Sequence, residues 1–153
     1  MVGSCPLTAG DMDKIKSAGA TAVFNIQTGP DMEARGYDWH QIKDKYRALG
    51  ILPFSYPIND LSEDGYTDGL FHAAQHLNDL VNEQGHTVYL HDNTGISRAP
   101  TLLLSYFCLY ARIRTYENLP EAAKLITSQC NTALPNLKII TKLLKRCKAF
   151  QQK

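Results

Sequence analysis

The stretch His91-Asp92-Asn93-Thr94-Gly95-Ile96-Ser97-Arg98-Ala99-Pro100 decides how the rest of this chain is interpreted. It stands between a strand-like apolar run, residues 87–90, and a helix-like apolar run, residues 101–110. A strand that passes through a glycine-containing loop into a helix aims backbone N–H groups and a helix N-terminus at one point, an arrangement that holds phosphate. Arg98, at the loop's exit, would add a bidentate guanidinium. An ordinary strand-to-helix connection is the alternative interpretation.

This stretch resembles the signature loop of the cysteine-dependent dual-specificity phosphatases, in which His-Cys is followed by five residues and an arginine; Asp92 stands at the cysteine position. The resemblance implies that His91 orients the loop and that Arg98 clamps the phosphate. It implies further that phosphate is bound by Arg98 and by the backbone amides of Asn93, Thr94, Gly95, Ile96 and Ser97. The implied fold is a three-layer α/β fold: a central mixed sheet of about four or five strands, flanked by helices, with a helical C-terminal third.

An aspartate at the nucleophile position changes both chemistry and binding. A thiolate attacks phosphorus because it is polarisable and is ionised near neutral pH when amide dipoles and a cation surround it. Asp92 in the same place would also be ionised, because accepted N–H bonds and a nearby cation favour the charged form. Two unit charges about 4 Å apart repel by roughly 4 kcal/mol at an effective dielectric constant of about 20. We therefore expect the chain as written to be inactive and to bind phosphate weakly.

A general acid is expected on a separate loop, because in this family an acid protonates the leaving alcohol. Asp60, in Ile58-Asn59-Asp60, matches that position, and Asp64 is the second candidate.

Three further segments resemble the glucan phosphatases, the branch that includes laforin and the plant starch phosphatases. They are residues 3–6, residues 23–31 and residues 36–39, and the pattern Asn25-x-Gln27-x3-Asp31 is what favours this branch. The implied substrate is phosphorylated glucan. A phosphoprotein remains the alternative, because the basic residues that this branch carries in the segment 129–137 are missing.

A surface that binds glucan should present aromatic rings, on which sugar C–H groups stack. We expect Tyr37, Trp39, Tyr56 and Tyr66 to rim the site. Core packing is equally compatible with Trp39, since it lies on the apolar face of a predicted helix.

Two functional hypotheses follow. The first is a phosphatase domain, of glucan or protein dual-specificity type, whose nucleophile has been replaced naturally or by engineering. The second is a natural pseudophosphatase, a binding or regulatory module that uses the pocket or its rim. An aspartyl-phosphate mechanism is less favoured, because such sites use a metal and the sequence shows no ligand cluster.

Length and composition limit the remaining possibilities. The 153 residues predict a single domain, 1–153, and the net charge of +1 gives no electrostatic reason to bind nucleic acid or an anionic membrane. The four cysteines form no metal-binding or disulfide pattern, and Cys108 is expected to be a buried thiol. We expect no cofactor, a monomer, and an intracellular, cytoplasmic location, or an organelle if a transit peptide has been removed.

Apolar periodicity predicts strands alternating with helices, and ligands then bind at the carboxyl ends of the strands. Gly29-Pro30 is expected to end the first strand, and residues 59–65 to form an acidic loop. Strands are predicted at 21–27, 51–57 and 86–90, and helices at 8–19, within 31–49, and at 66–81, 98–112, 116–128 and 135–150.

Overall fold

The computed structural model describes residues 1–111 and 118–151. Its strands form one sheet in the order β1-β4-β2-β3, with the bounds Val2–Gly3, Val88–His91, Ala22–Asn25 and Leu52–Ser55. Every pairing between neighbouring strands is parallel. The expectation of a mixed sheet is therefore wrong for the described residues. The reason is that helices, not hairpins, connect the consecutive strands.

Strand β2 lies inside the sheet, and all four of its residues are buried. Phe24 packs on one face with the core that includes Leu70 and Leu102, while Val23 packs on the other face with Met12 and Tyr46. Successive residues of a strand point to opposite faces, so a parallel strand covered on both sides is mostly apolar, as residues 22–24 are, while the buried Asn25 accepts a hydrogen bond from the Gln27 amide.

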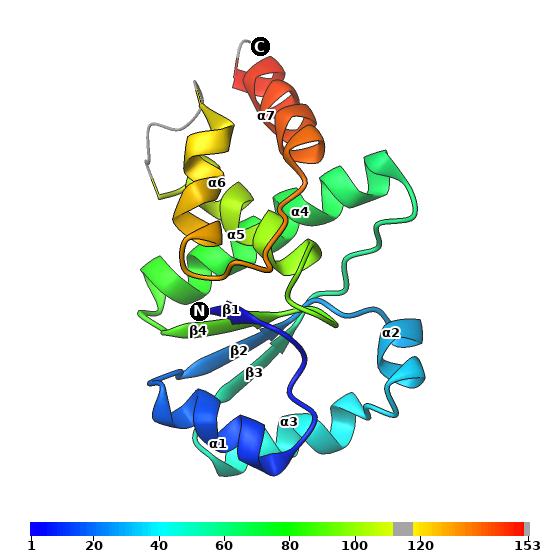
Figure 1. Cartoon of the computed structure of the whole chain (residues 1–153), viewed down its shortest axis with the longest axis vertical. Coiled ribbons are helices and arrows are strands. Elements are labelled where there is room, and N and C mark those ends of the chain that lie inside the picture. The colour runs from blue at the N-terminus through cyan, green and yellow to red at the C-terminus, as the bar shows by residue number, and fades with distance from the viewer. Residues whose placement is uncertain (112–117, 152–153) are drawn as a thin grey trace.

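Helices cover both faces of the sheet (Figure 1). Helices α1, Ala9–Ser17, and α3, Trp39–Ala48, lie on one face, and α4, Glu63–Asn78, and α5, Arg98–Leu109, lie on the other. A π-helical turn η1, Asp79–Glu83, extends α4. Helices α6, Leu119–Thr127, and α7, Leu137–Gln151, pack against α5 through a third apolar cluster. The predicted three layers and helical C-terminal third are confirmed.

Some boundaries differ from the predicted ones. Strand β1 was not predicted, and Gly29 begins a helix, α2, Gly29–Ala34, instead of only ending a strand. Thr28 and Asp31 form a capping box there, and Pro30 fits the first turn. Helix α4 begins at Glu63, inside the predicted acidic loop, because acidic side chains are favourable in a first turn. The predicted helix ends at residues 112 and 116 lie outside the described residues.

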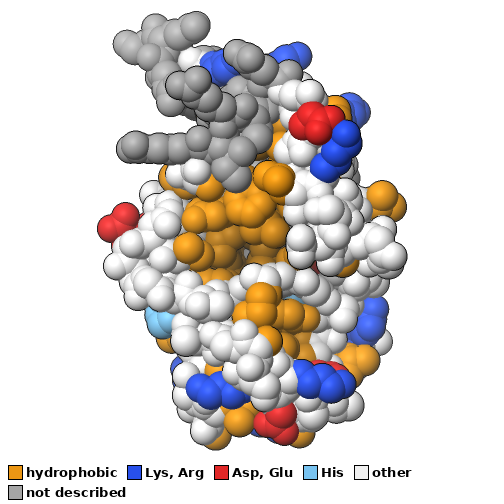
Figure 2. Space-filling model, turned by 60° about the vertical axis from the view of Figure 1, so that its left-hand side comes forward, with side chains coloured by type: hydrophobic (Ala, Val, Ile, Leu, Met, Phe, Trp, Pro, Cys, Tyr) orange, Lys and Arg blue, Asp and Glu red, His pale blue; other side chains and the backbone are white. Residues whose placement is uncertain are grey.

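One face carries an apolar hollow (Figure 2). A pocket of about 290 Å³ opens between the sheet edge, the end of α4 and α5, and its lining includes Leu77, Val81, Leu103 and Phe107. Cys108 is 2% exposed, which confirms its expected burial. Within residues 1–111 and 118–151, no helix is both long enough and apolar enough to cross a membrane.

Candidate active site

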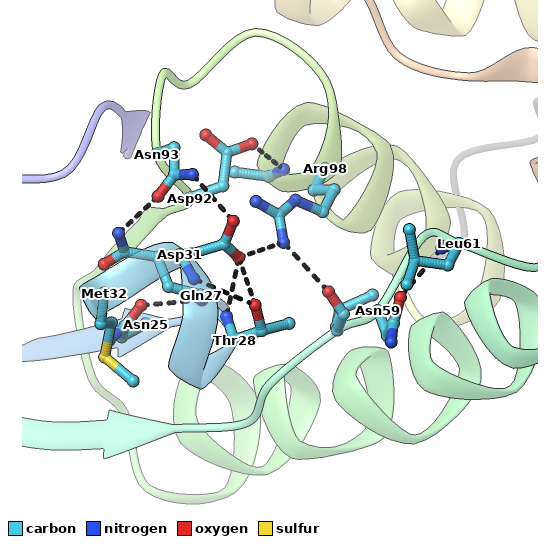
Figure 3. Close-up of polar contacts among 12 residues, drawn as sticks. Asn25, Gln27, Thr28, Asp31, Met32, Asn59, Leu61, Asp92, Asn93 and Arg98 are labelled. Carbon is cyan, nitrogen blue, oxygen red and sulfur yellow. Dashed lines mark hydrogen bonds and ion pairs between the residues drawn. The ribbon is translucent and has the colours of Figure 1, made fainter. Parts of the chain in front are cut away.

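Three segments meet at the carboxyl edge of the sheet (Figure 3). Residues 27–31 follow β2, residues 58–60 follow β3, and residues 92–98, here called the signature loop, follow β4. They converge because parallel strands all end at the same edge, and β4 and β3 both flank β2.

The signature loop closes around the side chain of its own first residue. Asp92 is 2% exposed, and its Oδ1 accepts the backbone N–H of Thr94 at 2.8 Å and that of Gly95. Its Oδ2 accepts the N–H of Ala99 at 2.9 Å. We call the backbone N–H donors of Thr94, Gly95 and Ala99 the cup. The ligand of the cup in this structure is the Asp92 carboxylate. The amide of Ile96 instead donates to the Thr94 hydroxyl within the loop, at 3.3 Å.

The same carboxylate caps helix α5. The first N–H groups of a helix have no intrahelical partner and carry a positive partial charge. Ser97, the residue before α5, makes no side-chain cap hydrogen bond, and Pro100 has no N–H to satisfy. Asp92 supplies the missing acceptor from seven residues upstream of Ala99. It therefore occupies the position at which a helix N-terminus binds an external anion.

Gly95 is required at the top of the loop for two reasons. Its φ of +73° lies in the left-handed region that favours glycine. A Cβ there would also lie 2.6 Å from the carbonyl carbon of Gly3 and 2.9 Å from the nitrogen of Ser4. The segment after β1 packs directly on the loop, and the Cys5 N–H donates to the Asn93 carbonyl at 3.4 Å.

Arg98 is held by a partner outside the loop. Its Nη1 donates to Asp31 Oδ2 at 2.7 Å and to the Ile58 carbonyl at 3.1 Å. The two charged side chains are only 11% and 20% exposed, so solvent screens the pair weakly. Burial disfavours the charged form of both side chains, but the hydrogen bond and the attraction between the two charges outweigh it. The pKa of Asp31 is therefore lowered well below its usual range, and the pKa of Arg98 is raised. Both groups are charged at neutral pH.

The Asp31 carboxylate also reaches the signature loop (Figure 3). Its Oδ1 accepts from Asn93 Nδ2 at 2.9 Å, and Asn93 Oδ1 accepts from Gln27 Nε2 at 2.6 Å. Its Oδ2 accepts from both the amide and the hydroxyl of Thr28, at 2.8 Å each. Sequence reasoning quoted Gln27 and Asp31 only as a family pattern and assigned them no role. The spacing Thr28-x-x-Asp31 was the available signal, but it indicates a helix cap, not a contact with Arg98.

His91 lies beneath the cup, fully buried. Burial lowers its pKa to about 4, so the ring is neutral at physiological pH. Its Nδ1 lies 3.3 Å from the Asp92 carbonyl oxygen, and the rings of Tyr37 and Tyr89 pack at 6.4 and 6.0 Å. These contacts fix the end of β4, where the loop begins.

The two candidate acids occupy different environments. Asp60 is exposed, and its negative charge contributes, after that of Asp31, to raising the pKa of Arg98. The Leu61 amide donates to Asn59 Oδ1 at 2.9 Å, a local turn that shapes this segment. Asp64 lies in the first turn of α4 and pairs with Lys142 at 2.9 Å. Asp60 is therefore the carboxylate that remains available beside Arg98.

The expected aromatic rim is only partly present. Tyr37 and Tyr66 are 7% and 4% exposed and belong to the cores on opposite faces of the sheet, so their assignment to the rim is wrong. Their apolar bodies are more favourable in the core than in water. Trp39 and Tyr56 are half-buried, and the Tyr56 ring packs 5.2 Å from that of His76. Tyr56 directly follows β3 at the carboxyl edge of the sheet, whereas Trp39 packs against the core that includes Tyr46. Both rings keep some exposed surface and remain the aromatic candidates for contact with glucan.

The chemistry open to this arrangement follows from its charges. The cup has backbone donors and an arginine suited to a tetrahedral oxyanion, yet its own carboxylate occupies the donors. A carboxylate stabilised by three N–H groups is a weak nucleophile. Among residues 1–111 and 118–151, no group of three or more His, Cys, Asp or Glu side chains is placed to hold a metal ion.

Comparison with curated proteins finds relatives of known activity. One is phosphoglucan phosphatase DSP4, amyloplastic, of Castanea sativa, 30% identical over 107 residues that make up 69% of this chain and 28% of that protein. Another is laforin of Mus musculus, 31% identical over 109 residues, 64% of this chain and 33% of that protein. The chain thus spans about a third or less of the length of these relatives. No family model matches the sequence.

Comparison with solved structures identifies the fold. The structure of PTPMT1 superposes with a TM-score of 0.69 and 14% sequence identity, covering 99% of this chain and 92% of that one. This likeness concerns the arrangement of the backbone, whereas the sequence relationship comes from the curated relatives. The chain is therefore a homologue of the glucan phosphatases, built on the fold of the dual-specificity phosphatases.

Proposed function

We propose that this chain is a glucan phosphatase-type domain without hydrolytic activity. The Asp92 carboxylate replaces the nucleophile and also fills the place of the substrate's phosphate. The observation that carries this proposal is the set of three N–H groups, from Thr94, Gly95 and Ala99, that bind the carboxylate. A phosphate dianion entering the cup would have to displace it or approach a like charge at close range.

The residues around the cup keep the roles implied for an active relative. Arg98 would clamp the equatorial phosphate oxygens, and the loop amides would stabilise the charge that develops on them. Asp60 would protonate the leaving alcohol, and His91 would hold the loop. The missing component is a polarisable nucleophile, because the Asp92 carboxylate holds the place among the cup's donors at which a thiolate would stand.

Restoring the thiol tests the proposal. We expect the Asp92→Cys chain to hydrolyse an aryl phosphate such as p-nitrophenyl phosphate, while the chain as written does not. Asp92→Ser is the matched control: it removes the negative charge but supplies no thiolate, so it should bind phosphate and remain inert. A Cys variant that folds, binds phosphate and is still inert would contradict the proposed catalytic scaffold.

The proposed substrate class is phosphorylated glucan, because the curated relatives include a protein named as a phosphoglucan phosphatase. Phosphate release from phosphorylated amylopectin by the Asp92→Cys chain, compared with release from phosphopeptides, tests this assignment. We expect the glucan to be preferred. Equal rates, or a preference for peptides, would favour a protein dual-specificity phosphatase instead.

One observation favours a second function, a binding or regulatory module. Because the Asp92 carboxylate accepts the hydrogen bonds of the cup's N–H groups, the loop keeps its shape in the absence of phosphate. Such a domain would bind a glucan or protein partner through its rim. Co-sedimentation of the chain as written with unphosphorylated amylopectin, and its loss on Trp39→Ala or Tyr56→Ala, would support this role.

We propose that the domain acts as a monomer inside the cell; the relative from Castanea sativa is named amyloplastic.

A further inference from the structure

The pattern Asn25-x-Gln27-x3-Asp31 has no part in the function proposed above, yet the side chains of Gln27 and Asp31 lie beside the cup, while Asn25 contacts Gln27 and Met32 (Figure 3). Asp31 contacts both ends of the signature loop, and Gln27 contacts Asn93. Asp31 accepts hydrogen bonds from Arg98, Asn93 and Thr28. It is thus bound at once to the last residue of the loop, to the second residue of the loop, and to the cap of its own helix.

We infer that Asp31 is the positioning residue for Arg98, and that Gln27 supports the same contact through Asn93. This inference rests on the proposed function, since it assigns Arg98 to an oxyanion.

The geometry shows how the positioning works. Asp31 Oδ2 and the Ile58 carbonyl both accept from the same nitrogen of Arg98, Nη1. The other guanidinium nitrogens are donors as well, and they form a fork that matches two oxygens of a tetrahedral oxyanion. Because two acceptors outside the loop bind Nη1, the plane of the guanidinium is fixed. The remaining nitrogen donors of Arg98 then face the cup (Figure 3). An arginine on a long flexible side chain otherwise loses considerable rotamer entropy when it binds.

Asp31 is itself held rigidly. Two Thr28 hydrogen bonds to Oδ2 and the Asn93 amide on Oδ1 leave the carboxylate no alternative rotamer that keeps its contacts. Gln27 Nε2 fixes the Asn93 amide in turn, at 2.6 Å from its oxygen. Gln27 and Asp31, which follow β2, therefore fix the position of the loop that follows β4.

The chain contains a matched control for this role. Helix α1 begins with the same capping box, formed by Thr8 and Asp11, with both reciprocal hydrogen bonds present. Asp11 is partly exposed, and its partners are all local: Leu7, Thr8 and Lys14. Asp11→Asn makes the same change in its capping box as Asp31→Asn makes in the other, replacing a carboxylate with an amide, and does not touch Arg98.

The first experiment observes Arg98 without any ligand. In the chain as written, ¹⁵N NMR should show slowed rotation of the Arg98 guanidinium, with separate Nη resonances. We expect these to merge in Asp31→Asn and to persist in Asp11→Asn. Unchanged Arg98 resonances in Asp31→Asn would overturn the inference.

The second experiment uses tungstate as a tetrahedral oxyanion and Asp92→Ala to empty the cup, with affinity measured by titration calorimetry. Adding Asp31→Asn should weaken tungstate binding about tenfold, within the coupling range of contacting charged groups. The same change on top of Arg98→Ala should cost nothing further, because Asp31 acts through Arg98. An equal loss with Arg98 absent, or tighter binding in Asp31→Asn, would overturn the inference. If the Asp92→Ala chain binds no tungstate while the NMR result holds, the positioning role stands and the proposed phosphate cup fails.

Discussion

The signature loop, residues 92–98, and the acid loop, residues 59–62, lie beside each other but are built in opposite ways. Partners from other segments hold the first: Asp31 binds both Asn93 and Arg98, and Asp92 is 2% exposed. The second is exposed, with Leu61 at 90%, and its hydrogen bonds are local: the Leu61 amide donates to Asn59, and the Gly65 amide donates to Ser62. The contrast indicates that the charges that meet an anion are fixed in advance, whereas the acid is carried on a segment with few constraints.

The largest effect should come from the acid loop once the nucleophile is restored. In an Asp92→Cys background, we expect Asp60→Asn to lower kcat about a thousandfold for an alkyl phosphate, whose leaving group needs a proton. Thermal stability should be unchanged, because Asp60 is exposed. Asp64→Asn is the control, since Asp64 pairs with Lys142. Similar kinetic losses in both variants would contradict the assignment of Asp60.

The signature loop should respond to a single methyl group. We expect Gly95→Ala to lower the free energy of unfolding by about 4 kcal/mol, because the left-handed backbone disfavours a Cβ and that atom would meet the backbone of Gly3. Gly85→Ala is the matched control: its φ is +71° and nothing lies within 4 Å of its Cβ. Gly85→Ala should lower the free energy of unfolding only by the cost of the left-handed backbone, about 1 kcal/mol. Urea unfolding measures both, and equal losses would exclude the close approach as the cause.

The buried histidine beneath the loop should make stability depend on pH. The pKa of His91 is about 4 in the folded chain against an ordinary value of 6.5. Between these values the unfolded chain binds more protons, so stability is complete above pH 6.5 and falls as the pH drops toward 4, by about 3 kcal/mol in total. Asp31 does not contribute in this window, since its lowered pKa acts only below 3.8. His91→Asn should flatten the profile, and an unchanged slope would contradict this cause.

The carboxylate in the cup should have a smaller but distinctive effect. Asp92→Ala leaves three N–H groups without their acceptor, and we expect it to cost about 2 kcal/mol. Added sulfate or tungstate should restore the loss in this variant and should not stabilise the chain as written. Differential scanning fluorimetry across anion concentrations measures both. Equal stabilisation of the two chains would show that the anion binds elsewhere.

Much of this protein could be predicted from local pattern. Periodicity indicated the strands around Val23, Phe54 and Leu90 and the helices of the C-terminal third, because apolar spacing reflects which face an element buries. The order of strand, glycine-containing loop and helix around Gly95 was sufficient to predict an anion cup. The all-parallel sheet, strand β1 and the burial of Tyr37 and Tyr66 were not predicted. Each of these depends on which segments become neighbours, and neighbours distant along the chain leave no periodic signal.

The two capping boxes show where sequence stops and tertiary structure begins. Thr8-x-x-Asp11 and Thr28-x-x-Asp31 are the same local pattern, and each begins a helix as the sequence requires. Nothing within either segment indicates that Asp31 binds Arg98, 67 residues later, while Asp11 binds only its own surroundings. That difference arises because β2 and β4 are parallel neighbours, so the segments that follow them end at one edge of the sheet. The sequence by itself therefore determined the caps and the cup, and only the pairing of strands decided which carboxylate holds the arginine.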